Sequence, residues 1–424
     1  MKAYKKTFDN GVRLLTVPMK DSPAVTVMAL TTVGSHNEKK EHQGVAHFLE
    51  HMAMKGGEKY STPYQVSSTL DSLGARSNAF TGGEYTGYYA KGHYKHFGRL
   101  LDVISDVYLR PRLDEQELER ERGVIIEEIN MYDDIPRERV ATILEELMYG
   151  DQPAGWPIAG TKEVIRSMDR ETMRKFHEKH YNSANTVVLV AGNVTSKEAT
   201  AEVGKYFASL PESRPSKRSR PKVSQKEPAV KTESRSTDQV HFRIGIHAYP
   251  ASDKRIPTLL VLNAVLGGGM SSRLFQKLRE EMGVCYYVGS GIEDHDKYGN
   301  LVISAGVDTK RVYEVVEVIA EELRRLREEE VDKKELKKAK DYLIGNLFLN
   351  LETSSGLGNF YLEQEILTGE LKTPYQVAKE IRAVEVKDVK KAARDLLVDK
   401  KLNLAAVGKD LKTASLKKKL TLGS

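Results

Sequence analysis

Apolar positions along the chain fall into two patterns, short strand-like runs and longer helix-like stretches. Residues 24–30 form an apolar run that leads, after a loop, into a helical pattern near residues 43–54. In residues 240–248, apolar side chains alternate with mostly polar neighbours, and a helical pattern follows near residues 255–266. Such alternation is typical of a half-buried strand. Several strands separated by long helices predict a layered α+β architecture.

The two halves of the chain repeat the same order of elements. Residues 185–192 and residues 401–408 are both apolar strands that end in glycine. Pairing Gly192 with Gly408 gives an offset of 216 residues, and the same offset places Val25 on His241. We interpret this repeat as the duplication of one α+β unit. The other interpretation is that two unrelated α+β domains share strands of this kind.

A segment rich in proline, serine and basic residues separates the halves. Residues 211–232 contain seven Lys or Arg and two Glu, with few apolar side chains to bury. This composition is typical of an extended linker. We therefore predict an N-terminal domain of residues 1–210, a linker of residues 211–232 and a C-terminal domain of residues 233–424.

The composition is that of an ordinary globular protein, with 40% hydrophobic and 30% charged residues. The net charge of +6 is modest and lies mostly in the predicted linker, unlike the charge of a nucleic-acid-binding protein. The single cysteine, Cys285, excludes an intramolecular disulfide and fits a reducing compartment. We find no signal peptide, and no apolar run approaches the roughly 18 residues that span a bilayer. We expect a cytoplasmic protein that binds neither nucleic acid nor membranes.

The most informative pentapeptide is His47-Phe48-Leu49-Glu50-His51. Residues i and i+4 of a helix lie on the same face, so both imidazoles can reach one ion. Neutral imidazoles are good ligands for Zn²⁺. Glu50 lies beside such an ion and could take a proton from a water that the metal acidifies. The other interpretation is an amphipathic helix with two surface histidines.

A third ligand would decide between these interpretations, because catalytic zinc usually has three protein ligands and one open position. Residues 117–131 are helical by composition, and Glu121 and Glu128 lie two turns apart on one face. One carboxylate could bind the metal while the other orients a ligand histidine. The same pattern also fits a charged helix that faces solvent.

These motifs resemble those of the pitrilysin/insulinase family of zinc peptidases, and most of all the branch that contains mitochondrial processing peptidase and its bacterial relatives. The family's inverted motif is His-x-x-Glu-His with a glutamate on a later helix. The resemblance covers nearly the whole chain. It implies that one Zn²⁺ per chain is held by His47, His51 and Glu128, that Glu121 lies behind a ligand, and that Glu50 is the catalytic base.

The resemblance also implies residues that contact a peptide substrate. An extended peptide would pair by backbone hydrogen bonds with an edge strand, which contains Asn78, Ala79, Phe80 and Thr81. Arg279 and Tyr286 match an Arg/Tyr pair that family members bring to the substrate, where it can stabilise an oxyanion. From spacing alone, a structural role for this pair is at least as well supported.

The fold expected from the resemblance is two homologous α/β sandwich domains that face each other as a clam shell. The expected function is that of a zinc-dependent endopeptidase or oligopeptidase, which hydrolyses peptides or unfolded segments in an enclosed chamber. Family members form dimers, and a chain with both the zinc ligands and the Arg/Tyr pair favours a homodimer. At the offset of 216 residues, none of the positions equivalent to the zinc set can bind zinc; these are Asn263, Leu266, Gly267 and Ile344. The alternative function is that of a non-catalytic structural or assembly subunit, as some family members have become.

Overall fold

The computed structural model describes residues 2–423 and divides into two compact units. The first unit consists of the chain up to Asn130, Trp156–Arg218 and Leu349–Thr373. The second consists of Met131–Gly155, Ser219–Phe348 and the chain from Pro374 onward. Each unit is built mainly from one half of the chain but includes a segment of the other half. The contiguous ranges expected from the sequence do not contain this exchange.

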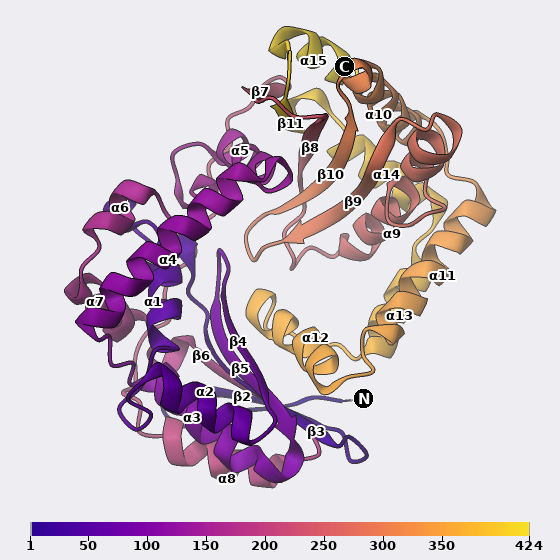
Figure 1. Ribbon diagram of the computed structural model, residues 1–424. Helices are drawn as coiled ribbons and strands as arrows, with labels where there is room; N and C mark the ends of the chain where they lie inside the picture. The colour runs from indigo at the N-terminus through magenta and orange to yellow at the C-terminus, as the bar shows by residue number, and fades with distance from the viewer. Residues whose placement is uncertain (1, 424) are drawn as a thin grey trace. The chain divides into compact units, whose positions relative to one another are not determined.

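The first unit contains a six-stranded sheet with the order β1-β2-β6-β3-β5-β4 (Figure 1). Its strands are β1 (Tyr4–Thr7), β2 (Arg13–Pro18), β3 (Ala24–Thr31), β4 (Arg76–Thr81), β5 (Thr86–His93) and β6 (Thr186–Gly192). β2 and β6 run parallel, and all other neighbours run antiparallel. Within the described residues β4 pairs with β5 alone, so one edge of the sheet ends at β4.

Helices cover both faces of this sheet. α3 and α8 belong to the main core on one face, together with Val25 and Val27 of β3. α12 packs on the other face, where Gly358 lies against Leu189 and Ala191 of β6. The helices are α1 (Val45–Ala53), α2 (Pro63–Ser72), α3 (Phe97–Leu109), α4 (Glu115–Asp134), α6 (Lys162–Ser167), α7 (Arg170–His180), α8 (Ser196–Phe207) and α12 (Ser354–Leu367), and the 3-10 turns are η1 (Ser35–Asn37), η2 (Lys40–His42), η3 (Tyr94–His96) and η5 (Ser183–Asn185).

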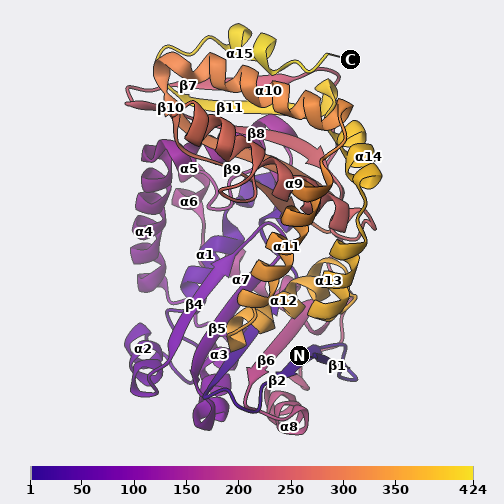
Figure 2. The same ribbon diagram turned by 90° about the vertical axis from the view of Figure 1, so that its right-hand side faces the viewer.

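The second unit repeats this plan with a five-stranded sheet of order β7-β11-β8-β10-β9 (Figure 2). Its strands are β7 (Ala229–Ser234), β8 (Gln239–Ala248), β9 (Cys285–Asp294), β10 (Gly299–Asp308) and β11 (Leu402–Gly408). The helices are α5 (Pro136–Tyr149), α9 (Ile256–Leu266), α10 (Val312–Glu328), α11 (Lys333–Leu349), α13 (Pro374–Ala383), α14 (Val386–Leu396), α15 (Thr413–Leu420) and the π-helix η6 (Phe275–Glu281), and the 3-10 turns are η4 (Pro153–Gly155), η7 (Thr309–Arg311) and η8 (Asp399–Lys401).

The helix α5 has the same place in the second unit that α12 has in the first. It packs on the face of the sheet opposite the main core, with Leu144 and Met148 against Gly245 of β8. The strand β11 lies between a parallel neighbour, β7, and an antiparallel neighbour, β8, as β6 lies between β2 and β3. The matching strand orders confirm the two-domain α+β fold and the duplication predicted from the sequence.

The predicted constant offset of 216 residues is wrong for the strands β3 and β8, which contain Val25 and His241. Val25 pairs with Gly192, whereas His241 pairs with Val407 rather than with Gly408. The offset that relates β3 to β8 is therefore one residue shorter than the offset that relates β6 to β11. A slip of one residue moves a side chain to the other face of a sheet. This explains why Val25 is fully buried in the core while its predicted equivalent His241 is only half-buried.

The predicted linker is shorter and better ordered than its composition indicates. Strand β7 begins at Ala229, inside the predicted range. At the other end, the Arg218 guanidinium donates hydrogen bonds to the carbonyl oxygens of Thr32, Glu84 and Ile366, at 3.2, 3.0 and 3.0 Å. These acceptors are backbone groups distant in sequence, so residue composition could not reveal them.

Candidate metal centre

Helix α1 carries three of the predicted site residues and is fixed firmly at its N-terminus. The chain enters it at Gly44 with φ of +86°, where a Cβ atom would lie 2.6 Å from the Ala159 carbonyl oxygen; a glycine fits this position. The Glu38 carboxylate accepts hydrogen bonds from the Gly44 and Ala46 N–H groups at 2.7 and 2.8 Å. These are donors that the start of a helix leaves without partners. The apolar face of the helix joins the core through Phe48, Leu49 and Met52.

The two histidines of α1 meet a carboxylate from α4, as the sequence predicted. His47 Nε2 lies 3.7 Å from Glu128 Oε2, and His51 Nε2 lies 3.5 Å from the same oxygen. One ligand atom from each of the three residues lies within 4.8 Å of the others. All three side chains are buried or half-buried. His47, His51 and Glu128 therefore form one compact cluster.

The donor set fits a zinc ion. Zinc binds imidazole nitrogen and carboxylate oxygen at roughly 2.0–2.2 Å, so two ligand atoms of a tetrahedral site lie about 3.3–3.6 Å apart. The separations of 3.5 and 3.7 Å to Glu128 Oε2 are close to this range. Three protein ligands leave one position open, which is the arrangement of catalytic zinc sites.

A second carboxylate of α4 contacts the back of one histidine. His51 Nδ1 donates a hydrogen bond to Glu121 Oε2 at 3.0 Å, and Lys55 Nζ lies 2.6 Å from Glu121 Oε1. The contact fixes the ring so that Nε2 points to the shared cluster. Of the two candidates on α4, Glu128 thus lies at the cluster and Glu121 behind it. Sequence reasoning missed Lys55, because the segment after α1 gives no sign of its tertiary partner.

The two histidines differ in their affinity for a proton. Burial, together with the nearby His51, lowers the pKa of His47 to about 4, while Glu128 acts in the other direction. For His51, burial also acts to lower the pKa, but hydrogen bonds to Glu121 and Glu128 and the charge of Glu50 outweigh it and raise the pKa to about 9. The carboxylates thus stabilise a cation at this place, and a metal ion would compete with the proton.

The predicted base Glu50 lies next to the cluster and contacts the edge strand. The Thr81 hydroxyl donates a hydrogen bond to Glu50 Oε2 at 2.7 Å. Burial raises the pKa of Glu50, and the Thr81 hydrogen bond and the charge of His51 act to lower it. The other residues predicted to line this edge, Asn78, Ala79 and Phe80, lie on β4 with Thr81 and are exposed or half-buried. The sequence gives no signal from which the contact between Thr81 and Glu50 could have been predicted.

Arg279 and Tyr286 lie together in the second unit. Arg279, on the π-helix η6, donates hydrogen bonds from Nη1 to the carbonyl oxygens of Cys285 and Tyr286, at 2.5 and 3.0 Å. The Tyr286 side chain is 73% exposed near the start of β9, so its phenol is available to solvent. Their predicted contact with substrate stays a prediction.

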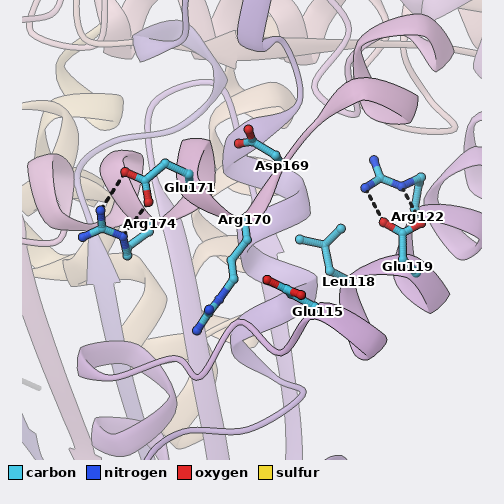
Figure 3. A pocket seen from close by; sticks show the side chains of 8 residues that line it. All are labelled: Glu115, Leu118, Glu119, Arg122, Asp169, Arg170, Glu171 and Arg174. Atoms are coloured by element: carbon cyan, nitrogen blue, oxygen red, sulfur yellow. Dashed lines mark hydrogen bonds and ion pairs between the residues drawn. The ribbon is translucent and has the colours of Figure 1, made fainter.

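A surface hollow of about 520 Å³ lies between α4 and α7 in the first unit (Figure 3). Its charges are largely paired, with Arg122 held by Glu119 and Arg174 held by Glu171. None of the predicted site residues lines it; its walls are Glu115, Leu118, Glu119, Arg122, Asp169, Arg170, Glu171 and Arg174. The first turns of α4 therefore line this hollow, while Glu128 lies in the cluster with His47 and His51 and Glu121 lies behind His51.

Two α+β units, one of which holds a His₂Glu cluster beside the further glutamate Glu50, define a two-domain protein with the ligand set of a zinc peptidase. Family models agree with this class. "Insulinase (Peptidase family M16)" matches residues 14–162, and "Peptidase M16 inactive domain" matches residues 167–343. The chain belongs to the insulinase family of peptidases, family M16. The three proposed ligands and the proposed base Glu50 all lie within the match to residues 14–162.

Bacterial relatives match nearly the whole chain. A protein described as uncharacterized zinc protease YmxG of Bacillus subtilis is 34% identical over 401 residues, which are 93% of this chain and 95% of that protein. An uncharacterized zinc protease of Streptomyces coelicolor is 31% identical over 410 residues, 95% of this chain and 89% of its own. The names of these relatives support a peptidase-family reaction and zinc as the metal.

Solved structures share the fold. A protease from Helicobacter pylori superposes with a TM-score of 0.87 at 23% identity, covering 96% of this chain and 99% of its own. A structure described as a peptidase M16 inactive domain from Pseudomonas fluorescens gives a TM-score of 0.90 at 18% identity, covering 97% and 100%. Among residues 2–423, no helix is long and apolar enough to cross a membrane.

Proposed function

We propose that the protein is a zinc-dependent endopeptidase or oligopeptidase that hydrolyses peptides or unfolded segments. The observation that carries this proposal is the convergence of His47, His51 and Glu128, with Glu50 beside them. Two imidazoles and one carboxylate would hold one Zn²⁺ per chain. The ion, when bound, supplies Lewis acidity, which lowers the pKa of a water and polarises a carbonyl group.

Glu50 has the position and the environment of a general base. Its carboxylate is buried, and Oε2 accepts a hydrogen bond from the Thr81 hydroxyl. Glu50 takes a proton from the attacking water and later delivers it to the leaving amine. A base that acts in both steps contributes about 10²- to 10⁴-fold to such reactions.

The substrate in this proposal is an extended peptide bound to the edge strand β4. Strand β4 ends the sheet order, so its outer backbone groups can pair with a peptide that adds a strand. Recognition through the main chain gives broad sequence specificity. Arg279 and Tyr286 would stabilise the oxyanion that forms at the cleaved carbonyl. The family resemblance supports this role for the pair, and it also supports cleavage inside an enclosed chamber.

The alternative proposal is a non-catalytic structural or assembly subunit. The description of the model matching residues 167–343 as an inactive domain supports this role for the second half of the chain. The ligands and the base all lie outside that range and are all present. A subunit that had lost its activity would be free to lose them, so we favour the peptidase.

We further propose a cytoplasmic homodimer that binds neither nucleic acid nor membranes. One chain carries both the zinc ligands and the Arg/Tyr pair, so two identical subunits suffice and an inactive partner is not required. The single cysteine is compatible with a reducing compartment. Size-exclusion chromatography with light scattering measures the number of subunits directly.

The test of the peptidase proposal is Glu50→Gln. We expect cleavage of a quenched fluorescent peptide to fall at least 100-fold, because the amide cannot take a proton, while zinc content by mass spectrometry stays at one ion per chain. Glu119→Gln, on an exposed side chain of α4, is the matched control and keeps full activity. A fully active Glu50→Gln protein would refute the base, and an inactive wild-type protein with zinc bound would favour the structural subunit.

A further inference from the structure

The hydrogen bond between Thr81 and Glu50 connects two parts of the proposed site that the sequence treats separately. Thr81 is the last residue of the edge strand β4, and Glu50 lies on the buried helix α1. The Thr81 hydroxyl donates to Glu50 Oε2 at 2.7 Å. Glu50 is only 9% exposed, so solvent offers this carboxylate few other donors. A hydrogen bond to a charged acceptor is among the stronger ones in proteins.

The backbone around Thr81 fixes the direction of its hydroxyl. Thr81 pairs with Thr86 at the end of the β4–β5 hairpin, and the Gly82 N–H donates to the Tyr85 carbonyl at 2.9 Å to close the turn. A β-branched side chain has few χ1 rotamers, so the position of the backbone largely sets that of the hydroxyl. The hydroxyl therefore holds Glu50 Oε2 from a rigid support.

We propose that Thr81 is a positioning residue for the base, which holds Glu50 Oε2 so that Oε1 faces the attacking water. This inference rests on the proposed function and deepens it. The same strand would pair with the substrate backbone and would hold the base, so peptide and base would be aligned by one element. Without this contact the Glu50 carboxyl group gains rotational freedom about its terminal torsion, which is broad for glutamate.

The experiment compares Thr81→Val with Thr81→Ser in the zinc-loaded full chain. Valine has nearly the shape of threonine and suits a strand but has no hydroxyl, whereas serine keeps the hydroxyl. We expect Thr81→Val to lower kcat about tenfold with KM and zinc content unchanged, and Thr81→Ser to recover most of the lost kcat. Thr200→Val, on helix α8, makes the same chemical change outside the site and keeps wild-type kinetics.

Crystal structures of the wild-type protein and Thr81→Val give a reading that does not depend on activity. We expect one orientation of the Glu50 carboxylate in the wild type and a rotated or divided orientation in the valine variant. A single unchanged orientation, or a wild-type kcat in Thr81→Val, would overturn the positioning role. An equal loss in Thr81→Ser would also overturn it, because the hydroxyl would then not be the cause.

The two proposals fail in different ways. A zinc-loaded wild type without peptidase activity would defeat the peptidase and leave the carboxylate orientation as the test of Thr81. A fully active Glu50→Gln protein would refute the base and, with it, the positioning role. An active wild type with an inactive Glu50→Gln variant and an unaffected Thr81→Val variant would retain the peptidase and defeat the positioning role.

Discussion

Two charged groups, Glu121 and Lys55, lie one behind the other on the far side of the proposed metal ligand His51. Lys55 contacts Glu121, which contacts His51. Burial acts to raise the pKa of Glu121, but hydrogen bonds from His51 and Lys55 outweigh it and keep the pKa below its usual value. Glu121 therefore stays a carboxylate, which can accept the Nδ1 proton of His51 and direct Nε2 to the ion. Lys55 supports a ligand that it does not touch.

We predict that Lys55→Met weakens zinc binding about 3- to 10-fold, because Glu121 loses the cation that holds it. Mutations behind metal ligands cost roughly 10- to 100-fold in affinity, and Lys55 lies one contact further away. Competition with a chelator measures the dissociation constant. Lys55→Arg keeps the charge and should lose less, and Lys205→Met, at an exposed lysine of α8, is the neutral control. Unchanged zinc affinity in Lys55→Met would contradict the proposed support.

The proposed metal ligands and Glu50 could be chosen from the sequence because their signals are local. His47 and His51 are four residues apart on one helix, and Glu121 and Glu128 are seven apart on another. Family resemblance then assigned the two glutamates. The contact of Lys55 with Glu121, and that of Thr81 with Glu50, depend on where the helices and the strand meet in the fold. No spacing in the chain encodes such distances.

At the scale of elements, the N-terminus of α1 is held by Glu38, which lies in the loop before the helix. Glu38 is buried and accepts two hydrogen bonds from the start of the helix that carries His47 and His51. Burial raises the pKa of Glu38 to about 8, while the two N–H donors act to lower it. The folded protein thus binds this proton more tightly than the unfolded chain, in which the pKa is about 4.5. The contribution of protonated Glu38 to the free energy of unfolding is therefore complete below pH 4.5 and is lost as the pH rises through 8.

We predict that this contribution distinguishes the wild type from Glu38→Gln, which cannot titrate. The free energy of unfolding of the zinc-free wild type, relative to the variant, should decrease by on the order of 1–4 kcal/mol between pH 5 and pH 8.5. Denaturant unfolding followed by circular dichroism measures the difference at each pH. A difference that is constant over this range would show that Glu38 does not titrate there.

The boundaries of several elements could be predicted from apolar patterns. The helix expected near residues 43–54 is α1 (Val45–Ala53), and the strand expected in residues 240–248 is β8 (Gln239–Ala248). The pattern could not show which sheet a helix covers. α5 and α12 are amphipathic or apolar helices like the others, and only the folded contacts show that each completes the sheet of the other half.

At the scale of the whole molecule, this exchange determines how the chain can be divided. The first sheet needs α12 on one face, and α12 follows the segment that joins the halves. The second sheet needs α5, which precedes that segment. Neither half of the sequence contains all the parts of its own unit.

We predict that cutting the joining segment does not separate the halves. With a protease site inserted after Val223, which is exposed, the two fragments should elute together in size-exclusion chromatography, because each still supplies a helix to the other's sheet. Denaturant should then release them, and the uncut protein provides the reference elution. Two fragments that elute separately without denaturant would contradict the exchange.

The close packing of α12 on β6 at Gly358 limits how the chain can be truncated. A truncation that kept only residues 1–210 would leave Leu189 and Ala191 without their cover and expose an apolar sheet face to solvent. Selection on the chemistry of one half therefore also preserves the other half, which contributes none of the proposed zinc ligands.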